Sequence, residues 1–234
     1  MLLSVIIITL NEERNLKRLL EQLRQQSFKD VEIIVADAHS KDRTRDVARS
    51  FDVQVVDGGL PSVGRNAGAA VATGDLLLFL DADTVFPSTD FLKDMLAEMQ
   101  HRRLDIAGVT LFADTSNPVD RFGYWCYSKY ALLWGSILPH AVGTCIFSKT
   151  FVHRAIDGFD ETVTLAEDML YARQGSNVGR FGILKTHSVG TPPRRIQKEG
   201  RIRLAFKLIW AEIYMLVNGP IRNNAITWDF DHSD

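Results

Sequence analysis

Two aspartates one residue apart, Asp81 and Asp83, close a short apolar run over residues 76–80. An apolar run of this length between the turn-forming residues Gly74 and Pro87 is typical of a buried strand. Carboxylates are costly to bury in an apolar core, so this strand end must meet water, a cation or a hydrogen-bonding ligand. If the chain stays extended, both carboxylates point the same way and suit Mg²⁺ or Mn²⁺ carrying a substrate's phosphates. Alternatively, one aspartate caps a turn and the other is solvated.

A cation stands near the start of a predicted helix of small residues, where Arg65 follows Gly64 in the segment 64–72. The positive end of a helix disfavours a cation unless an anion lies nearby. Gly64 and Gly68 have no side chain to keep such an anion away from the backbone. The pattern therefore indicates an anion close to Arg65.

The composition of the 234-residue chain is ordinary for a globular protein, with 46% hydrophobic and 24% charged residues. Its net charge of −2 argues against a nucleic acid partner bound through overall charge. Cys126 and Cys145 match no metal or redox spacing, so we expect reduced cysteines in a cytoplasmic protein. The apolar start, residues 1–10, lacks a basic region and predicts a strand rather than a signal peptide, and no transmembrane helix is expected.

Strand and helix patterns alternate through the first half of the chain. Strands are predicted at residues 2–9, 31–36, 53–56, 76–80, 105–112, 143–147 and 181–186. Helices are predicted after Asn11, after Ser40, over 64–72, after Ser88, over 117–134, from Glu167 and over 204–217. The alternation favours an α/β fold, in which a parallel sheet has helices on its faces. No repeat or Pro/Ser-rich linker divides the chain, so a single domain over residues 1–234 is the simplest organisation.

Six short motifs follow one another along the chain. They are residues 4–13, residues 37–42, Gly64-Arg65-Asn66, Asp81-Ala82-Asp83, residues 157–161 and Glu167-Asp168. The ordered set resembles the motif series of family 2 glycosyltransferases over about 3–195. Within this family, the chain most resembles a subgroup of small bacterial and archaeal members. Their chains end in a stretch like Thr191-Pro-Pro-Arg194-Arg195.

The resemblance implies the GT-A fold, a Rossmann-like, mixed and mainly parallel sheet flanked by helices. It implies a nucleotide-sugar-binding half over about 1–112 and an acceptor half over about 113–195. A C-terminal helical extension would then cover about 196–234. The activity implied is that of a hexosyltransferase, which moves a sugar from a nucleoside-diphosphate sugar to an acceptor.

The same resemblance assigns a nucleotide site to the ends of the early strands. Its implied members are Thr9, Asn11, Glu12, Asp37, Arg65, Asp81 and Ala82. Asp37 would accept a hydrogen bond from a ring N–H of uracil or guanine, because a carboxylate can only accept. The alternatives are that Asn11 caps a helix and that Asp37 is a solvated strand end. Ser40 and Asp42 are expected to be helix caps rather than ligands.

For the metal, the resemblance implies that Asp83 binds Mn²⁺ or Mg²⁺ directly and that Asp81 faces the metal or the ribose. His187 would be a further ligand, since neutral imidazole can bind Mn²⁺, although a single histidine can equally be structural. The ion would neutralise charge on the leaving nucleoside diphosphate. Arg194 and Arg195 would close over the diphosphate, because guanidinium pairs with phosphate oxygens in bidentate fashion.

The acidic pair Glu167-Asp168 matches the family's catalytic base. Asp168 would take the proton of an acceptor hydroxyl, Glu167 would hold the acceptor or metal site, and in-line displacement would invert the anomeric carbon. Acids at a helix start also favour the helix dipole without any catalytic role. An acceptor that is a lipid phosphate is already anionic and needs no base, and the pair would then serve in positioning.

The acceptor is expected to be a carbohydrate, or a lipid-linked one such as a polyprenyl phosphate or a lipid-linked glycan. Aromatic residues over 117–134 and the basic and aromatic segment 194–217 either pack in the core or rest on anionic lipid at the inner face of the membrane. Two other functions remain open. One is a haloacid-dehalogenase-like phosphatase that uses Asp81 and Asp83, and the other is an inactive nucleotide-sugar-binding protein.

Overall fold

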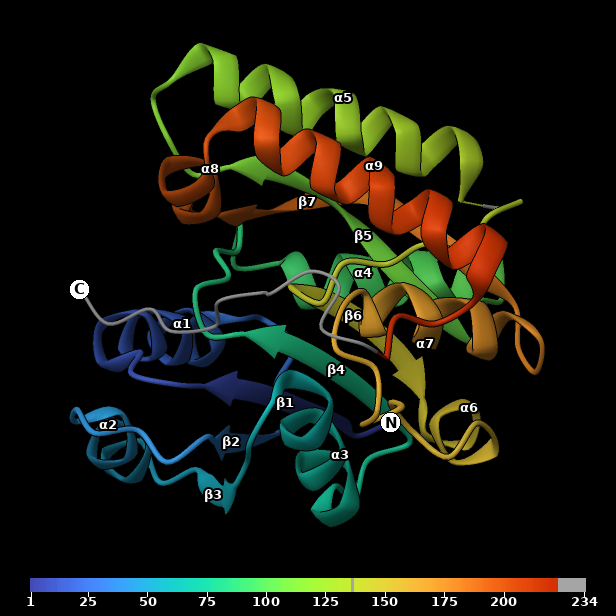
Figure 1. Cartoon of the computed structure of the whole chain (residues 1–234). Helices are drawn as coiled ribbons and strands as arrows, with labels where there is room; N and C mark the ends of the chain where they lie inside the picture. The colour runs from blue at the N-terminus through green and yellow to red at the C-terminus, as the bar shows by residue number, and fades with distance from the viewer. Residues whose placement is uncertain (136, 223–234) are drawn as a thin grey trace.

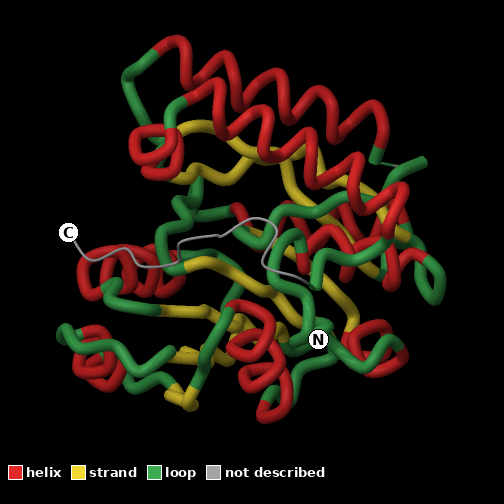
Figure 2. The backbone as a smooth tube through the Cα atoms, viewed as in Figure 1, coloured by secondary structure: helices red, strands yellow, loops and turns green. Residues whose placement is uncertain are grey.

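The structure, a computed structural model, describes residues 1–135 and 137–222. Within this part of the chain one mixed sheet has the strand order β3-β2-β1-β4-β6-β5-β7 (Figures 1 and 2). The strands are β1 Leu3–Thr9, β2 Val31–Asp37, β3 Gln54–Asp57, β4 Leu76–Asp81, β5 Ile106–Ala113, β6 Cys145–Lys149 and β7 Phe181–Thr191. All seven predicted strands are present, and the mixed, mainly parallel GT-A-like sheet is confirmed.

The first four strands form the parallel half of the sheet. β1 pairs with β2 on one side and with β4 on the other, and β2 pairs with β3. The register sets Thr9 opposite Asp37, and Ile8 opposite Asp81. Because the carboxyl ends of these parallel strands meet at one edge, the polar residues that follow them gather there.

The strand order changes direction beyond β4. β6 runs antiparallel to both β4 and β5, and it pairs Cys145 with Leu80 near the carboxyl end of β4. The segment that enters β6, residues 140–144, therefore arrives at the same edge as the ends of β1, β2 and β4. β7 lies parallel to β5 at the sheet's far side, with a register shift after Val109.

Helices cover both faces of the sheet. They are α1 Glu13–Gln25, α2 Thr44–Ser50, α3 Pro61–Val71, α4 Phe91–Arg102, α5 Pro118–Trp134, α6 Thr150–Ala155, α7 Glu167–Ser176, α8 Arg194–Glu199 and α9 Arg201–Asn218. On one face Leu16, Leu19 and Leu20 of α1 and Phe91 of α4 pack with Val5 in a buried cluster. A second cluster, on residues of opposite parity in β1 and β4 such as Ile6 and Phe79, contains Val152 of α6 and Tyr171 of α7. The helices α6 and α8 were not predicted from the sequence.

α5 and α9 form an outer layer beyond β5 and β7 (Figure 1). α9 buries Ala211 and Met215 against Leu165 and Met169, in a small third cluster. α5 buries Ser128 and Ala131, but Phe122 and Trp125 remain exposed, so its aromatic residues do not all pack in the core. The part of the predicted C-terminal extension beyond residue 222 lies outside the described residues.

None of the helices in the described part of the chain is long and apolar enough to cross a membrane.

Candidate active site

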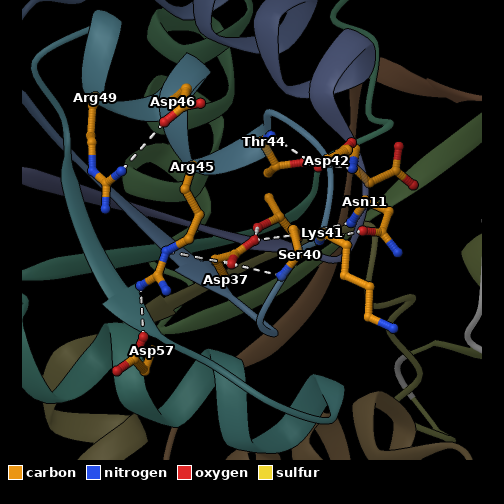
Figure 3. A network of polar contacts seen from close by, with 12 residues as sticks. Asn11, Asp37, Ser40, Lys41, Asp42, Thr44, Arg45, Asp46, Arg49 and Asp57 are labelled. Atoms are coloured by element: carbon orange, nitrogen blue, oxygen red, sulfur yellow. Dashed lines mark hydrogen bonds and ion pairs between the residues drawn. The ribbon is translucent and has the colours of Figure 1, made fainter.

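The ends of β1 and β2 carry a closed polar network (Figure 3). The Asp37 carboxylate is fully buried and accepts hydrogen bonds from the Thr9 hydroxyl at 2.9 Å and from the Ser40 backbone N–H at 3.0 Å. It also accepts from the Ser40 hydroxyl at 2.5 Å, and Arg45 Nε lies 3.6 Å away. Asp37 is therefore not a solvated strand end. Its carboxylate braces the turn that follows β2.

The helix caps differ from the sequence prediction. Asn11 does not cap α1: its side chain accepts from the Lys41 N–H at 2.8 Å, and its φ of 54° lies in the left-handed region that asparagine tolerates (Figure 3). Ser40 likewise lies before α2 and accepts from the Asn11 N–H. Asp42 is the capping residue, since its carboxylate accepts from the first N–H groups of both α2 and α1, at Thr44 and Glu13. The predicted cap role of Asp42 is correct, and that of Ser40 is wrong.

Arg65 joins the two acidic motifs of the chain. Its guanidinium is 3% exposed and contacts Asp81 through Nη2 at 3.1 Å and Glu167 through Nη1 at 2.8 Å. It also lies over the Phe159 ring, 5.2 Å from the centroid. The end of β4 and the start of α7 are thereby held together by one buried cation between two carboxylates.

From the sequence, Arg65 was expected near the start of a helix and close to an anion, and the structure changes both points. α3 begins at Pro61, so Arg65 lies in the second turn and not at the helix end. The anions that pair with it are the protein's own Asp81 and Glu167. Arg65 is thus buried and paired with two carboxylates of the protein itself, and its contact with a nucleotide stays a prediction.

Asp168 follows Glu167 at the start of α7, and its carboxylate accepts hydrogen bonds from two backbone N–H groups. The Gly143 N–H donates to Oδ2 at 2.6 Å and the Met169 N–H donates to Oδ1 at 2.8 Å. Burial, followed by the negative charge of Glu167, raises the pKa of Asp168 to about 6, while Arg65 acts in the opposite direction. A carboxyl group with this pKa exchanges its proton close to neutral pH, which suits a general base.

Gly143 and Thr144 belong to the site although the sequence did not single them out. The Thr144 hydroxyl lies 3.5 Å from Asp81 Oδ2, and Gly143 bonds Asp168. A Cβ atom on Gly143 would lie 2.3 Å from Arg65 Nη2. A residue without a Cβ atom is therefore favoured here, and the glycine at the start of the predicted strand 143–147 was the available signal.

Gly143→Ala is expected to lower stability by about 1–3 kcal/mol, because the added methyl group must displace a buried guanidinium that two carboxylates hold. Thermal denaturation would measure the loss. Gly123→Ala on the exposed face of α5 is the matched control, since nothing lies within 4 Å of its new methyl group, and it should be neutral or slightly stabilising. Equal melting temperatures for the two variants would show that Arg65 is not confined as described.

Asp83 lies in the turn after β4 and contacts a different cation. Arg194 Nη2, at the start of α8, is 2.8 Å from Asp83 Oδ2 and 2.9 Å from Glu12 Oε1. β4 ends at Asp81 and the Thr84 N–H bonds back to the Asp81 carbonyl, so the chain turns and the two aspartates do not share one direction. The condition for aligned carboxylates, an extended chain as far as Asp83, is therefore not met.

The described residues contain no group of three His, Cys, Asp or Glu side chains placed to hold a metal ion. His187 Nε2 lies 2.8 Å from Asp94 Oδ2 of α4, and its ring is near Phe91. His187 is therefore paired with Asp94 and not with Asp81 or Asp83 in this structure, and its role as a metal ligand stays a prediction. A divalent cation still fits the chemistry at Asp83, because a cation, the Arg194 guanidinium, already stands between two carboxylates there.

The motif over 157–161 is held against α3 by one side chain. Asn66 donates to the Phe159 carbonyl at 2.8 Å and accepts from the Phe159 N–H at 2.8 Å. Gly158 has a φ of +76°, and a Cβ there would lie 2.6 Å from Asn66 Oδ1. These contacts place Phe159 beneath Arg65.

Comparison with known proteins agrees with this architecture. The model of the family described as Glycosyl transferase family 2 matches residues 4–157. The chain therefore belongs to glycosyl transferase family 2. Its fold is the GT-A fold of the structural neighbours.

One similar curated protein is the 4,4'-diaponeurosporenoate glycosyltransferase of Staphylococcus haemolyticus, 36% identical over 114 residues, which are 44% of this chain and 30% of that protein. The chain spans about a third of the length of the curated relatives it matches. Among solved structures, S. aureus TarS 1-349 in complex with UDP-GlcNAc has a TM-score of 0.67 at 22% identity, covering 82% of this chain and 58% of that one. The mannosyltransferase PcManGT from Pyrobaculum calidifontis, in complex with GDP-Man and Mn²⁺, has a TM-score of 0.68 at 18% identity, covering 90% and 61%.

Proposed function

We propose that this chain transfers a sugar from a nucleoside-diphosphate sugar to an acceptor, in a metal-dependent reaction that inverts the anomeric carbon. The observation that carries the proposal is the chain of contacts Asp81–Arg65–Glu167 with Asp168 beside it. It sets a carboxyl group with a pKa of about 6 next to the strand ends where α/β sheets bind ligands. Family membership makes sugar transfer the chemistry to expect at such a site.

The donor would bind over the carboxyl ends of β1, β2 and β4. Asn11 and Glu12 would border its base and ribose, with the Thr9–Asp37 pair as the brace beneath them. Asp81 and Ala82 would lie beside the ribose and the diphosphate. We propose both UDP-sugars and GDP-sugars as candidate donors, since the two solved structures described above hold UDP-GlcNAc and GDP-Man.

Asp83, with Asp81, would hold Mn²⁺ or Mg²⁺, because hard carboxylate oxygens suit these ions. When bound, the ion supplies a positive charge for the leaving diphosphate. Arg194 would then exchange its contact with Asp83 for the diphosphate oxygens, and Arg195 would join it. The exchange would keep a cation at Asp83, with the divalent ion in place of the guanidinium.

Asp168 would remove the proton from the acceptor hydroxyl on the side of the sugar opposite the diphosphate. Glu167 and Arg65 would keep the Asp168 carboxyl in place and set its proton affinity. A raised pKa is useful only where a proton must be taken. We therefore favour a hydroxyl acceptor, such as that of a lipid-linked glycan, over a polyprenyl phosphate, which is already ionised.

We further propose that the chain works at the cytoplasmic side of a membrane, with its C-terminal segment in peripheral contact with lipid. The support for this is the exposure of large apolar side chains on α9, where Phe206 is 70% exposed. A lipid-linked acceptor would reach the site from that side.

The proposal is tested by a thermal-shift screen with UDP- and GDP-sugars in the presence and absence of Mn²⁺. A ligand that binds the folded state raises the melting temperature. At a ligand concentration a hundred times its Kd, the free energy of unfolding increases by about 2.7 kcal/mol. We expect a shift with one nucleoside-diphosphate sugar and slow release of that diphosphate, and the matching nucleoside monophosphate serves as the control. Hydrolysis of p-nitrophenyl phosphate without any such shift would favour the phosphatase, and a shift without turnover an inactive binding protein.

A further inference from the structure

The outer face of α5 carries an apolar stripe that is interrupted by Lys129, whose Nζ lies 5.6 Å from the centroid of the Trp125 ring. Phe122, Trp125 and Leu133 recur at helical spacing and are 63%, 55% and 72% exposed. The opposite side of the helix carries the buried residues Ser128 and Ala131. This exposed stripe is therefore not the packing side of α5, and large exposed apolar patches of this kind mark interaction sites.

α9 repeats the arrangement. Phe206, Ile209 and Ile213 are 70%, 57% and 56% exposed, whereas Ala211 and Met215 face the interior. The spacing of four and three residues places the exposed three on one stripe. α9 is thus amphipathic, with its larger apolar side chains directed away from the protein.

The two helices lie side by side in one outer layer (Figures 1 and 2). An ion pair between Arg201 Nε and Asp120 Oδ1 at 2.7 Å joins their first turns. Each helix buries its inner side against the body of the protein and leaves its apolar stripe exposed. We call the six residues Phe122, Trp125, Leu133, Phe206, Ile209 and Ile213 the two-helix face.

The charged residues of the helices around this face are mainly basic. α5, α8 and α9 contain eight arginines and lysines but three acidic residues. Each acidic residue has a cationic partner within the protein: Asp120 pairs with Arg201, Glu199 with Lys207 and Glu212 with Arg173. Arg121 and Arg203 are exposed beside the stripes, and Lys129 is exposed within the stripe of α5.

We propose that the two-helix face binds the surface of an anionic lipid bilayer, with α5 and α9 lying in the plane of the interface. Exposed Phe, Trp and aliphatic side chains would enter the headgroup boundary, and the flanking cations would contact anionic headgroups. A second copy of the chain is a poorer occupant, because it would bring the same positive charges into opposition. The assignment extends the proposed membrane contact from the C-terminal segment to α5, and it concerns binding alone, so it holds whether or not sugar is transferred.

The test is co-sedimentation of the full chain with phosphatidylcholine vesicles, with and without phosphatidylglycerol, in the absence of donor and metal. We expect binding to the anionic vesicles that weakens with added salt. The double variant Phe206→Ser/Ile213→Ser should lower the partition coefficient by about tenfold or more, given roughly 1.5–3 kcal/mol for each fully buried side chain. Arg203→Gln should weaken binding to anionic vesicles only.

The matched control is Phe151→Ser/Val178→Ser, whose two residues are 52% and 44% exposed outside α5 and α9. This control should bind vesicles like the unaltered chain. Equal binding by both double variants, or none by the unaltered chain, would overturn the proposal. Self-association in sedimentation velocity that Phe206→Ser/Ile213→Ser abolishes would assign the face to a second copy and overturn it equally. The donor thermal shift, measured on the same variants, reports separately on the sugar-transfer site.

Discussion

Asp168→Asn is expected to lower the turnover of sugar transfer by about 10³-fold, within the range of about 10²–10⁴ that a general base contributes. The Gly143 and Met169 N–H groups donate to different oxygens of Asp168, so the single oxygen of the asparagine can accept from only one of them, and one of the two hydrogen bonds is lost while the fold should persist. The asparagine has no basic site for the acceptor's proton. Initial rates with the donor found in the thermal-shift screen would measure the loss.

The pH profile gives an independent check on the same residue. Because the pKa of Asp168 is raised to about 6, the proton-free form grows as pH rises through about 6, and kcat/KM should rise with it. Glu167→Gln removes a negative charge that raises this pKa and leaves Arg65 to lower it, so the rise should move to lower pH. The folded protein binds this proton more tightly than the unfolded chain does. The contribution of Asp168 to the free energy of unfolding therefore falls as pH rises from about 4 to about 6.

The control for these two variants is the donor's thermal shift, which should be unchanged by Asp168→Asn. A turnover within threefold of the unaltered enzyme would contradict the assignment of Asp168 as base. That result would assign Glu167 and Asp168 to positioning alone. Such a role is expected if the acceptor is a phosphate, which needs no base.

Asp83→Ala is expected to abolish transfer and to weaken metal-dependent nucleotide binding. Changes merely beside a metal site cost about 10–100-fold in affinity, so loss of a direct ligand should cost on the order of 100-fold or more. Calorimetry with the nucleoside diphosphate and Mn²⁺, and then with EDTA, would measure this. In EDTA the variant should bind no more weakly than the unaltered chain, because the carboxylate that repels the diphosphate has gone.

Asp46→Ala is the matched control for this variant. Asp46 is also an exposed acid beside an arginine, with Arg49 Nη1 at 3.4 Å, and it lies outside the predicted site. Its removal should change neither affinity nor melting temperature by much, since exposed ion pairs contribute about 0–1 kcal/mol. Wild-type affinity of Asp83→Ala for the diphosphate with Mn²⁺ would refute the metal assignment.

Family and fold were accessible from the sequence. The apolar run before Asp81 and the Leu16–Leu19–Leu20 spacing of α1 are local signals of burial, and the structure buries both. Residues at the carboxyl ends of β1, β2 and β4 gathered as expected, because parallel strands bring those ends to one edge. Helix caps were less predictable, since Asp42 bonds two helices at once and Asn11 none.

What the sequence determined by itself is therefore the alternation of buried strands and amphipathic helices, and which strand ends carry carboxylates, since both follow from local composition and periodicity. Only the tertiary structure decided the partners. Arg65 meets Glu167 across 102 residues of sequence and Arg194 meets Glu12 across 182, while His187 turns to Asp94 instead of the aspartates after β4. Such pairings depend on the antiparallel insertion of β6 and on where β7 and α8 end, and no local pattern contains that information.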